Sequence, residues 1–216
     1  MKDLSVTYSD IRLCSLKEVS DMVGRPLAQV QILDRAHALG QAYTTGAKSR
    51  YYPYERIAEL ASAPRWDKSG FVQRLAELGI QAQKAVVLRQ IDAQPTAGPA
   101  GRTWYGFDMA AEMSEDAAVR AGQTDASRMV WKVSSSNLAL VRSLAPGQAL
   151  PLVITVGGLV VAGREIIGVD EAVTAEVGDL VAFEVQDAGP WLEAVKFSWL
   201  NSGPGQPILW WDLPQE

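Results

Sequence analysis

The stretch SLKEVSDMVG (residues 15–24) decides how the N-terminal part of this chain folds. Ser15 and Glu18 have the spacing of a capping box, in which the serine hydroxyl accepts from the amide of Glu18 and the carboxylate accepts from the amide of Ser15. Apolar residues then recur at helical spacing as far as Gly24, and a glycine there can end a helix in the left-handed conformation. The stretch therefore predicts a short, well-delimited helix.

The residues after Gly24 predict the remaining elements of a small module. Pro26 suits the first turn of a second helix, because no hydrogen bond is lost there, and Gly40 can stop that helix. Residues 43–52 (YTTGAKSRYY) favour two short strands around a glycine-containing tip, and a third helix follows. The order helix, turn, helix, hairpin, helix is that of a winged helix-turn-helix. We therefore predict a DNA-binding domain over residues 1–62.

Charge is spread unevenly along the chain. Residues 1–58 contain eight Lys or Arg and six Asp or Glu, which gives +2, whereas the whole chain carries −5 and the remainder therefore −7. A positive N-terminal part suits contact with phosphates. The acidic overall balance argues against a protein that coats nucleic acid.

Residues 15–60 resemble the winged-helix module of MerR-type regulators and phage excisionases. The resemblance rests on Ser15–Gly24, Pro26-Leu-Ala-Gln-Val30, Leu39-Gly40, and Arg50-Tyr51-Tyr52-Pro53 followed by Ile57 and Leu60. It implies that the second helix lies in the major groove and that the hairpin meets the phosphates. The DNA-binding residues expected on this basis are Lys17, Arg25, Gln29, Gln31, Arg35, Lys48, Arg50, Tyr51 and Tyr52.

Two features depart from the MerR pattern. Residues 31–33 (Gln-Ile-Leu) stand where MerR-type proteins usually carry an arginine and tyrosines, which weakens the expected phosphate clamp. A MerR-type dimer also needs a long coiled-coil helix after the module, and Gly70 and Gly79 interrupt residues 66–92. A module used only for protein contacts is therefore a standing alternative, and a homodimer is left open.

The rest of the chain changes in character. Residues 63–101 are predicted to be a connector with a helix and then either a strand or more helix, because QPTAGPAG (residues 94–101) has the composition of a linker. Residues 102–216 favour strands, including one at 129–133 and a hairpin around Gly157-Gly158. We predict the α+β class, with an N-terminal winged helix-turn-helix followed by a β-rich domain built as a small barrel.

Residues 102–213 resemble the PUA superfamily in its EVE or ASCH form. The resemblance rests on Trp104-Tyr-Gly-Phe-Asp-Met109, Arg128-Met-Val-Trp-Lys-Val-Ser134, Val160–Gly168, Val181–Val185 and Gly203–Trp210. It implies a small β-barrel that cradles a nucleic-acid base, often modified, in an aromatic pocket. A flipped base needs a stacking wall and hydrogen bonds to its edge. Candidates are Tyr105, Trp131 and Ser134, with Asp108 as an acceptor, although packing or helix capping would explain each of them too.

The sequence predicts no enzyme, no metal and no cofactor. His37 and Cys14 are the only histidine and cysteine, so the usual zinc site cannot be built from them. P-loop, zincin and nucleophile-elbow motifs are absent. An acidic cluster leaves a metal-dependent nuclease as a minor alternative, although a serine followed by two acidic residues is also typical of a helix start. The cluster comprises Asp108, Glu112, Glu115 and Asp116.

These observations together predict a function. No stretch has the unbroken apolar length of a membrane helix, and the N-terminus does not resemble a signal peptide, so we expect a cytoplasmic protein. The function predicted is that of a DNA-binding transcriptional regulator, with double-stranded DNA as partner and a C-terminal domain that senses an effector or reads a base. One alternative is a reader of modified nucleic acid, in defence or phage biology, whose β-domain binds a flipped base. Another is a non-enzymatic protein-interaction module.

Overall fold

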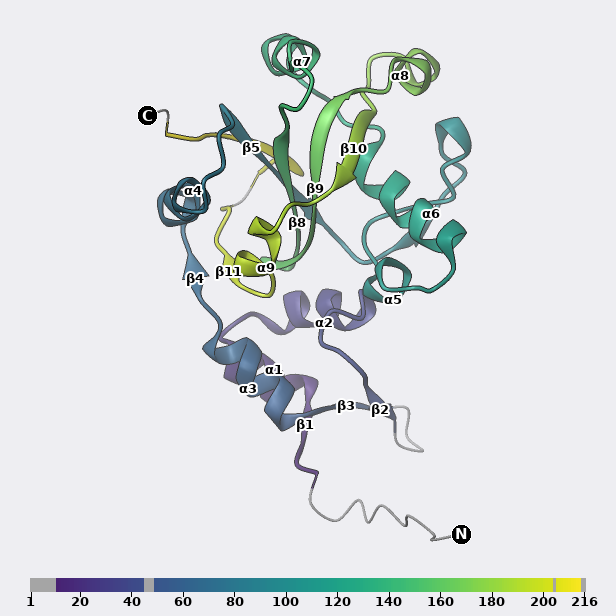
Figure 1. Ribbon diagram of the computed structural model, residues 1–216. Coiled ribbons are helices and arrows are strands. Elements are labelled where there is room, and N and C mark those ends of the chain that lie inside the picture. The colour runs from purple at the N-terminus through teal and green to yellow at the C-terminus, as the bar shows by residue number, and fades with distance from the viewer. Residues whose placement is uncertain (1–10, 45–48, 204, 215–216) are drawn as a thin grey trace, which may run out of the picture.

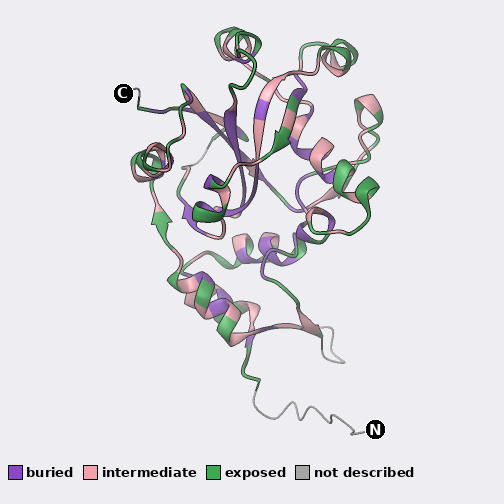
Figure 2. Ribbon diagram, viewed as in Figure 1, coloured by how far each residue is buried: buried purple, intermediate pink, exposed green. Residues whose placement is uncertain are grey.

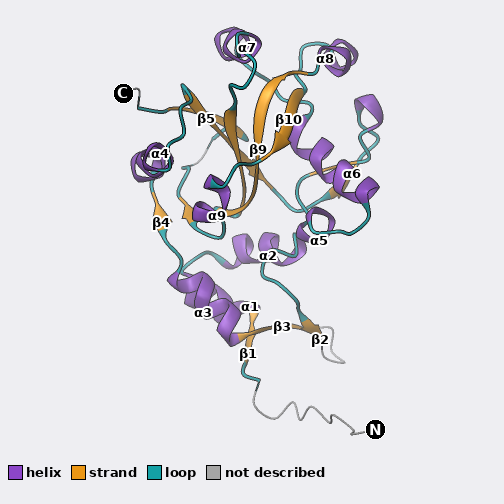
Figure 3. Ribbon diagram, viewed as in Figure 1, coloured by secondary structure: helices purple, strands orange, loops and turns teal. Residues whose placement is uncertain are grey.

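The computed structural model describes residues 11–44, 49–203 and 205–214 as an α+β structure in which helices surround one main sheet (Figures 1 and 3). We call the part up to residue 62 the N-terminal module and the rest the body. The module consists of β1 (Leu13–Ser15), α1 (Leu16–Val23), α2 (Leu27–Arg35), β2 (Tyr43–Thr44), β3 (Arg50–Pro53) and α3 (Tyr54–Ser62). The body begins with β4 (Arg65–Trp66), α4 (Lys68–Glu77), β5 (Lys84–Gln90), β6 (Gln94–Pro95), a 3-10 turn (Pro99–Gly101), β7 (Trp104–Tyr105), α5 (Met109–Glu112), α6 (Ala117–Arg128) and α7 (Ser135–Arg142). It ends with β8 (Leu150–Val156), β9 (Leu159–Val169), α8 (Glu171–Val177), β10 (Phe183–Asp187), α9 (Trp191–Val195), β11 (Trp199–Leu200) and β12 (Ile208–Asp212).

The start of the module follows its local sequence closely. The amide of Glu18 donates to the Ser15 hydroxyl at 3.4 Å, and the amide of Ser15 donates to the Glu18 carboxylate at 2.7 Å, so the predicted capping box is present. Gly24 ends α1 with φ of +63°, in the left-handed region. Helix α2 starts directly after Pro26, as predicted.

Helix α2 ends earlier than its sequence predicts, at Arg35 and not near Gly40. His37 takes a φ of +53°, which no helix permits. The carbonyl of Ala36 accepts from the amide of Met109 in the body at 2.9 Å. A contact with a distant part of the chain therefore sets this helix end, and the local pattern does not contain it.

The predicted hairpin forms and joins a third strand. β3 pairs antiparallel with both β2 and β1, and the sheet order is β1-β3-β2. Lys48, expected at the hairpin tip, lies outside the described residues. The described part of the module thus has the predicted element order.

The segment predicted as a connector belongs to the body's main sheet. That sheet has the order β12-β5-β8-β9-β11-β4, and β10 adds to the far end of β9. β5 is parallel to β8 and antiparallel to β12, and its residues 85–88 are fully buried. The strand alternative for this segment is therefore the one observed. The glycine- and proline-rich stretch at 94–101 pairs with β7 through β6 and so folds onto the body as well.

The sheet of the described residues is open, in contrast to the predicted small barrel. Its two edge strands, β12 and β4, do not pair with each other. The strand predicted at 129–133 is reduced to one bridge between Trp131 and Val181, because Val130 has φ of +69° and breaks the extended backbone. A residue with positive φ interrupts the extended, pleated backbone that the hydrogen bonds between β-strands require.

One continuous hydrophobic core runs from the module into the body. It includes Val30 and Leu33 of α2 and the buried strands β8 and β9 (Figure 2). Helix α2 lies between the rest of the module and the body (Figure 1). None of the described helices has both the length and the apolar character needed to cross a membrane.

Polar contacts reinforce this junction of module and body. Arg35 donates to both carboxylate oxygens of Asp92 at 2.8 and 3.1 Å. His37 Nδ1 lies 2.8 Å from the carboxylate of Asp108. The indole of Trp199 donates to the carbonyl of Leu60 at 2.6 Å. The end of α2, the turn after it and α3 are therefore all joined to the body.

The contact between Arg35 and Asp92 predicts a pH dependence of stability. The hydrogen bond from Arg35 is the main reason why the pKa of Asp92 lies below its ordinary value of 3.8. A depressed carboxyl pKa adds stability above the unfolded-state value, and that stability is lost as the pH falls through the lower folded-state value. We expect Asp92→Asn to reduce the loss of unfolding free energy seen in urea titrations below pH 3.8.

Arg35→Gln serves as the second arm of that experiment. It removes the main cause of the low pKa and leaves the carboxyl in place, so it should reduce the acid-induced loss in the same way. An unchanged acid dependence in both variants would contradict the ion pair.

Candidate functional site

A pocket of about 450 Å³ opens in the body between the end of β5, β6–β7 and the end of α6. This volume falls in the range of small-molecule sites, roughly 300–1,000 Å³. Residues from four separate segments line it: Arg89, Gln90, Ile91, Thr96, Gly98, Pro99, Arg102, Tyr105, Gly106, Ala126, Val130, Trp131 and Pro207. We call it the β5–α6 pocket.

Two aromatic residues that the sequence singled out meet in this pocket. Tyr105 is 41% exposed at the end of β7, and Trp131 is half-buried just after α6. The Trp131 indole donates to the carbonyl of Ser127 at 2.7 Å, and the Trp131 backbone makes both bonds of its bridge with Val181. The ring of Trp131 is therefore held in place by its own protein, as a stacking surface for a planar ligand must be.

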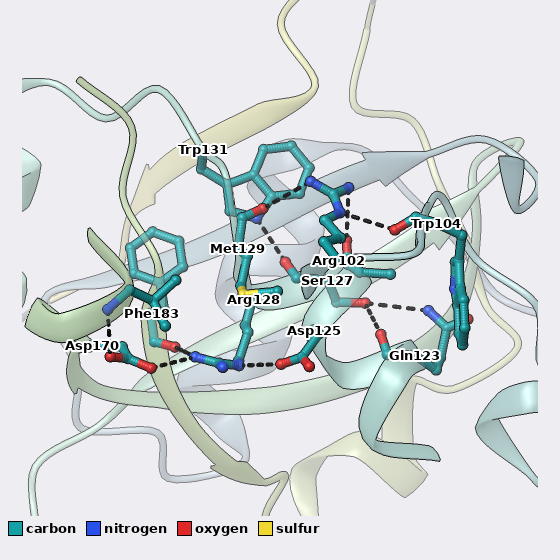
Figure 4. Close-up of polar contacts among 12 residues, drawn as sticks. Arg102, Trp104, Gln123, Asp125, Ser127, Arg128, Met129, Trp131, Asp170 and Phe183 are labelled. Carbon is teal, nitrogen blue, oxygen red and sulfur yellow. Dashed lines mark hydrogen bonds and ion pairs between the residues drawn. The ribbon is translucent and has the colours of Figure 1, made fainter. Parts of the chain in front are cut away.

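The guanidinium of Arg102 lies against the same pocket, and its hydrogen bonds within the described residues all go to backbone carbonyls (Figure 4). Its Nε donates to Trp104 at 2.9 Å, and its two terminal nitrogens donate to Met129 and Ala126 at 3.4 Å each. Burial lowers the pKa of Arg102, and no described carboxylate forms an ion pair with it. An arginine has five N–H donors, so two remain for a ligand.

Gln90 supplies a buried acceptor at the floor of the pocket. The residue is 7% exposed, and its amide nitrogen donates to the carbonyl of Ala126 at 3.4 Å. Its Oε1 is buried without a hydrogen-bond partner among the described residues. A buried acceptor without a donor is costly, so an N–H group of a ligand that reached this oxygen would relieve that cost.

The pocket has no negative charge of its own. None of its lining residues is acidic, whereas Arg89 and Arg102 are both cationic. Among the described residues, the side chain of Arg89 donates to the carbonyl of Gln206 at 3.3 Å. An electron-rich ligand edge, such as carbonyl or ring-nitrogen acceptors, therefore suits this lining.

Backbone conformation at the rim is unusual. Val130 is β-branched and yet has φ of +69°, and Ala100, beside the lining residue Pro99, has φ of +54°. Each such conformation costs on the order of 1–3 kcal/mol and is kept only where the surroundings require it. Two of the four described non-glycine residues with positive φ thus lie at this pocket.

The end of α6, which presents Trp131, is anchored from its other side. Arg128 donates to Asp125 at 2.7 Å, to Asp170 at 2.9 Å and to the carbonyl of Phe183 at 3.2 Å (Figure 4). These bonds join α6 to the start of α8 and to β10. The position of the indole is therefore determined by the fold and not by a free loop.

The other two predicted pocket residues lie elsewhere. Asp108 accepts from the amide of Ala110 at the start of α5 and faces His37. Ser134 accepts from the amide of Asn137 and caps α7. For these two residues the capping interpretation describes their contacts. Sequence reasoning missed Arg102 and Gln90, because nothing local indicates that residues 90, 102 and 131 meet.

The acidic cluster is dispersed in the fold. Glu112 forms an ion pair with Arg164 at 2.6 Å, and Asp116 caps α6 through the amide of Ala118. Across residues 11–44, 49–203 and 205–214, no three His, Cys, Asp or Glu side chains gather where a metal ion would fit.

The predicted DNA-binding residues that the structure describes divide into three groups. Lys17 and Gln31 are exposed, and Tyr51 is half-buried in β3. Arg25 and Gln29 instead line a second cavity between α2 and the body. The remaining three described residues have partners within the chain: Arg35 pairs with Asp92, while Arg50 and the buried Tyr52 both donate to Asp34. The structure thus does not bring all of these residues to one open face.

The comparisons with known proteins leave the site to be argued from its own geometry. No family model, curated protein or solved structure matches this chain.

Proposed function

We propose that this protein binds nucleic acid by taking a single base, plain or modified, into the β5–α6 pocket. The observation that carries the proposal is that Tyr105 and Trp131 line one pocket together with Arg102, which forms no ion pair among the described residues. Enzymes and readers that act on a flipped base hold it by stacking and by hydrogen bonds to its edge. The same chemistry is present here in residues from separate segments.

The polar groups suggest which edge of a base the pocket favours. Arg102 offers two free N–H donors, and Gln90 offers one buried acceptor. A base edge with a carbonyl oxygen next to an N–H or amino group satisfies both. The resemblance of residues 102–213 to PUA-type domains implies the same kind of ligand, although the main sheet of the described residues is open and not the small barrel that the resemblance implies.

Binding of fluorescein-labelled single-stranded oligonucleotides to the full chain tests the proposal. We expect Trp131→Ala to weaken binding by about fivefold to 150-fold, since stacking on one base is worth about 1–3 kcal/mol. Gln90→Met keeps the side-chain volume and removes the acceptor, and it should reduce discrimination between bases more than it reduces affinity. Anisotropy titrations against a panel of plain and modified bases measure both effects.

Trp66→Ala is the matched control, because Trp66 is also half-buried but lies in β4, outside the pocket. It should bind like the wild-type protein. Thermal melts of each variant show that the fold is retained. Equal affinity in wild type and Trp131→Ala, or no binding of any oligonucleotide by the wild-type protein, rejects the base pocket.

A second candidate is a winged helix-turn-helix regulator that reads duplex DNA. The observation in its favour is the element order of the module, together with the exposed strip of α2 formed by Leu27, Ala28 and Gln31. In this arrangement Gln31 is the residue available to a base edge in the major groove. The MerR-like resemblance of residues 15–60 supports the same candidate.

Mobility-shift titrations with duplex DNA separate this candidate from the first. Gln31→Ala should relax selectivity, whereas Gln29→Ala should leave it unchanged, because Gln29 faces the body. The opposite pattern, or an absence of any duplex shift, rejects reading of a duplex by the open face of α2.

A further inference from the structure

A second cavity, of about 250 Å³, lies between part of helix α2 and the body. It is bounded by the turn between α1 and α2, by the Gly157-Gly158 turn of the β8–β9 hairpin, and by residues 200–203. A Cβ atom at Gly157 would lie 3.2 Å from the carbonyl oxygen of Gln29, so the hairpin turn approaches α2 closely. We call this space the junction cavity.

Cations line the junction cavity and no acidic residue does. Arg25 and Arg89 both reach it, along with the polar side chains of Gln29, Thr155, Asn201 and Ser202. The Nε of Arg25 is buried without a hydrogen-bond partner in the described part of the chain. Two arginines with no carboxylate partner and an unused N–H are a binding arrangement for an anion.

Arg25 is also held close to a second positive charge. Its guanidinium carbon lies 5.0 Å from the ring centroid of Trp199, and that of Arg65 lies 5.6 Å from the same centroid. Burial and the Arg65 charge lower the pKa of Arg25. Like charges in a partly buried place repel each other, so an anion in the cavity would relieve a repulsion that the free protein retains.

Gln29 fits the same chemistry. Its Oε1 is buried without a partner, and no described hydrogen bond fixes its amide. Rotation by 180° about the last side-chain bond exchanges oxygen for NH2, and the two orientations are equivalent in shape. An anion would select the orientation that donates.

The junction cavity adjoins the β5–α6 pocket. Arg89, Gln90 and Ile91, at and just after the end of β5, line both. A nucleotide whose base occupies one space therefore has a cationic space beside it for a phosphate.

We propose that the junction cavity is a phosphate site, in which Arg25 and Arg89 hold the phosphate group next to the base in the β5–α6 pocket. The anion site itself stands on the lining of the cavity alone, whereas its assignment to a nucleotide rests on the proposed function. The N-terminal module would then contribute to binding through the turn before α2, because Arg25 belongs to it.

Isothermal titration of the full chain with inorganic phosphate, a nucleoside, the matching nucleoside 5′-monophosphate and a single-stranded oligonucleotide tests the proposal. We expect phosphate to bind the wild-type protein, and Arg25→Gln and Arg89→Gln each to weaken it about tenfold. Arg142→Gln is the control. This exposed arginine pairs with Glu171 and does not line the junction cavity, so its variant should bind phosphate like the wild-type protein. Trp131→Ala should keep phosphate binding.

The outcomes separate the two proposals. Phosphate bound equally by wild type, Arg25→Gln and Arg89→Gln, or not bound by wild type, overturns the anion site. If Trp131→Ala loses nucleoside binding and keeps phosphate binding, both proposals are supported. If the wild-type protein binds phosphate but no nucleoside, only the base pocket is overturned. If the nucleoside monophosphate binds more tightly than the nucleoside, and Arg25→Gln loses this gain in affinity, the ligand is a free nucleotide. If only the oligonucleotide shows the gain, the ligand is a nucleic-acid strand.

Discussion

Gly106→Ala is expected to lower the free energy of unfolding by about 3 kcal/mol, and the melting temperature by roughly 6–12 °C for a chain of this size. Gly106 has φ of +91°, and a Cβ there would lie 2.3 Å from the carbonyl oxygen of Asp92. This carbonyl is backbone and cannot move aside easily, because the amide of Phe107 donates to the carbonyl of Ile91 and the amide of Ala93 donates to the carbonyl of Phe107. A left-handed non-glycine residue costs about 1–2 kcal/mol, and overpacking costs about 1–3 kcal/mol.

Gly79→Ala isolates the conformational part of that cost. Gly79 has a similar φ of +78°, and nothing lies within 4 Å of the position of its Cβ. We expect a loss of about 1 kcal/mol at this position, measured by thermal and urea denaturation of both variants. Equal losses in the two variants would mean that residues 91–92 do not approach Gly106 as closely as described. Because Gly106 also lines the β5–α6 pocket, its variant should bind oligonucleotides less tightly as well.

Asp34→Ala has the second large expected effect, a loss of about 3 kcal/mol in unfolding free energy. Asp34 is 7% exposed and accepts from the hydroxyl of Tyr52, which is 1% exposed, and from Arg50 at 2.9 Å. Burial and the bond to Asp34 raise the pKa of Tyr52, so the tyrosine remains a neutral donor. Alanine would leave a buried hydroxyl and a guanidinium without their acceptor.

A double-mutant cycle measures this interaction directly. Asp34→Asn keeps an acceptor for Tyr52 and should cost less than Asp34→Ala, while Tyr52→Phe removes the donor. The sum of the losses of unfolding free energy in Asp34→Ala and Tyr52→Phe should exceed the loss in the double variant by about 1 kcal/mol or more, as is typical of residues in one network. Additive losses would show that Asp34 and Tyr52 do not interact.

This network also affects how a test of duplex binding is interpreted. Arg50 was expected to meet phosphates, but within the chain it neutralises Asp34. Arg50→Ala would therefore weaken the module as well as any DNA contact. Gln31, which is exposed and makes no described side-chain hydrogen bond, gives the cleaner test.

Predictions that rest on a single cap or turn are confirmed. The capping box at Ser15, the left-handed Gly24 and the turn at Gly157-Gly158, where both glycines have positive φ, all appear as predicted. Each depends on hydrogen bonds or φ angles within a few residues, so the information lies in the stretch itself. The sequence likewise indicates Tyr105 and Trp131 as aromatic candidates, although it does not show that both line one pocket.

Contacts between distant segments account for the differences. The glycine- and proline-rich residues 94–101 have the composition of a linker, yet they pair with β7 and help to form the pocket rim. Glycine and proline are common both in linkers and in folded turns, and composition does not distinguish these two structures. Similarly, the apolar pattern of α2 indicates a buried side, but it does not show that the body covers Arg25 and Gln29 as well.

By itself, then, the sequence determined where the helices of the module begin, where the β8–β9 hairpin turns, and that the chain combines helices with a sheet. Tertiary structure alone decided that β5 lies within the main sheet, that Arg102 and Gln90 join Trp131, and that α2 rests on the body. The physical reason is the separation along the chain between the groups that stabilise each feature. Caps and turns are stabilised by neighbours in the chain, whereas a pocket and a covered helix face depend on which distant apolar surfaces leave water together.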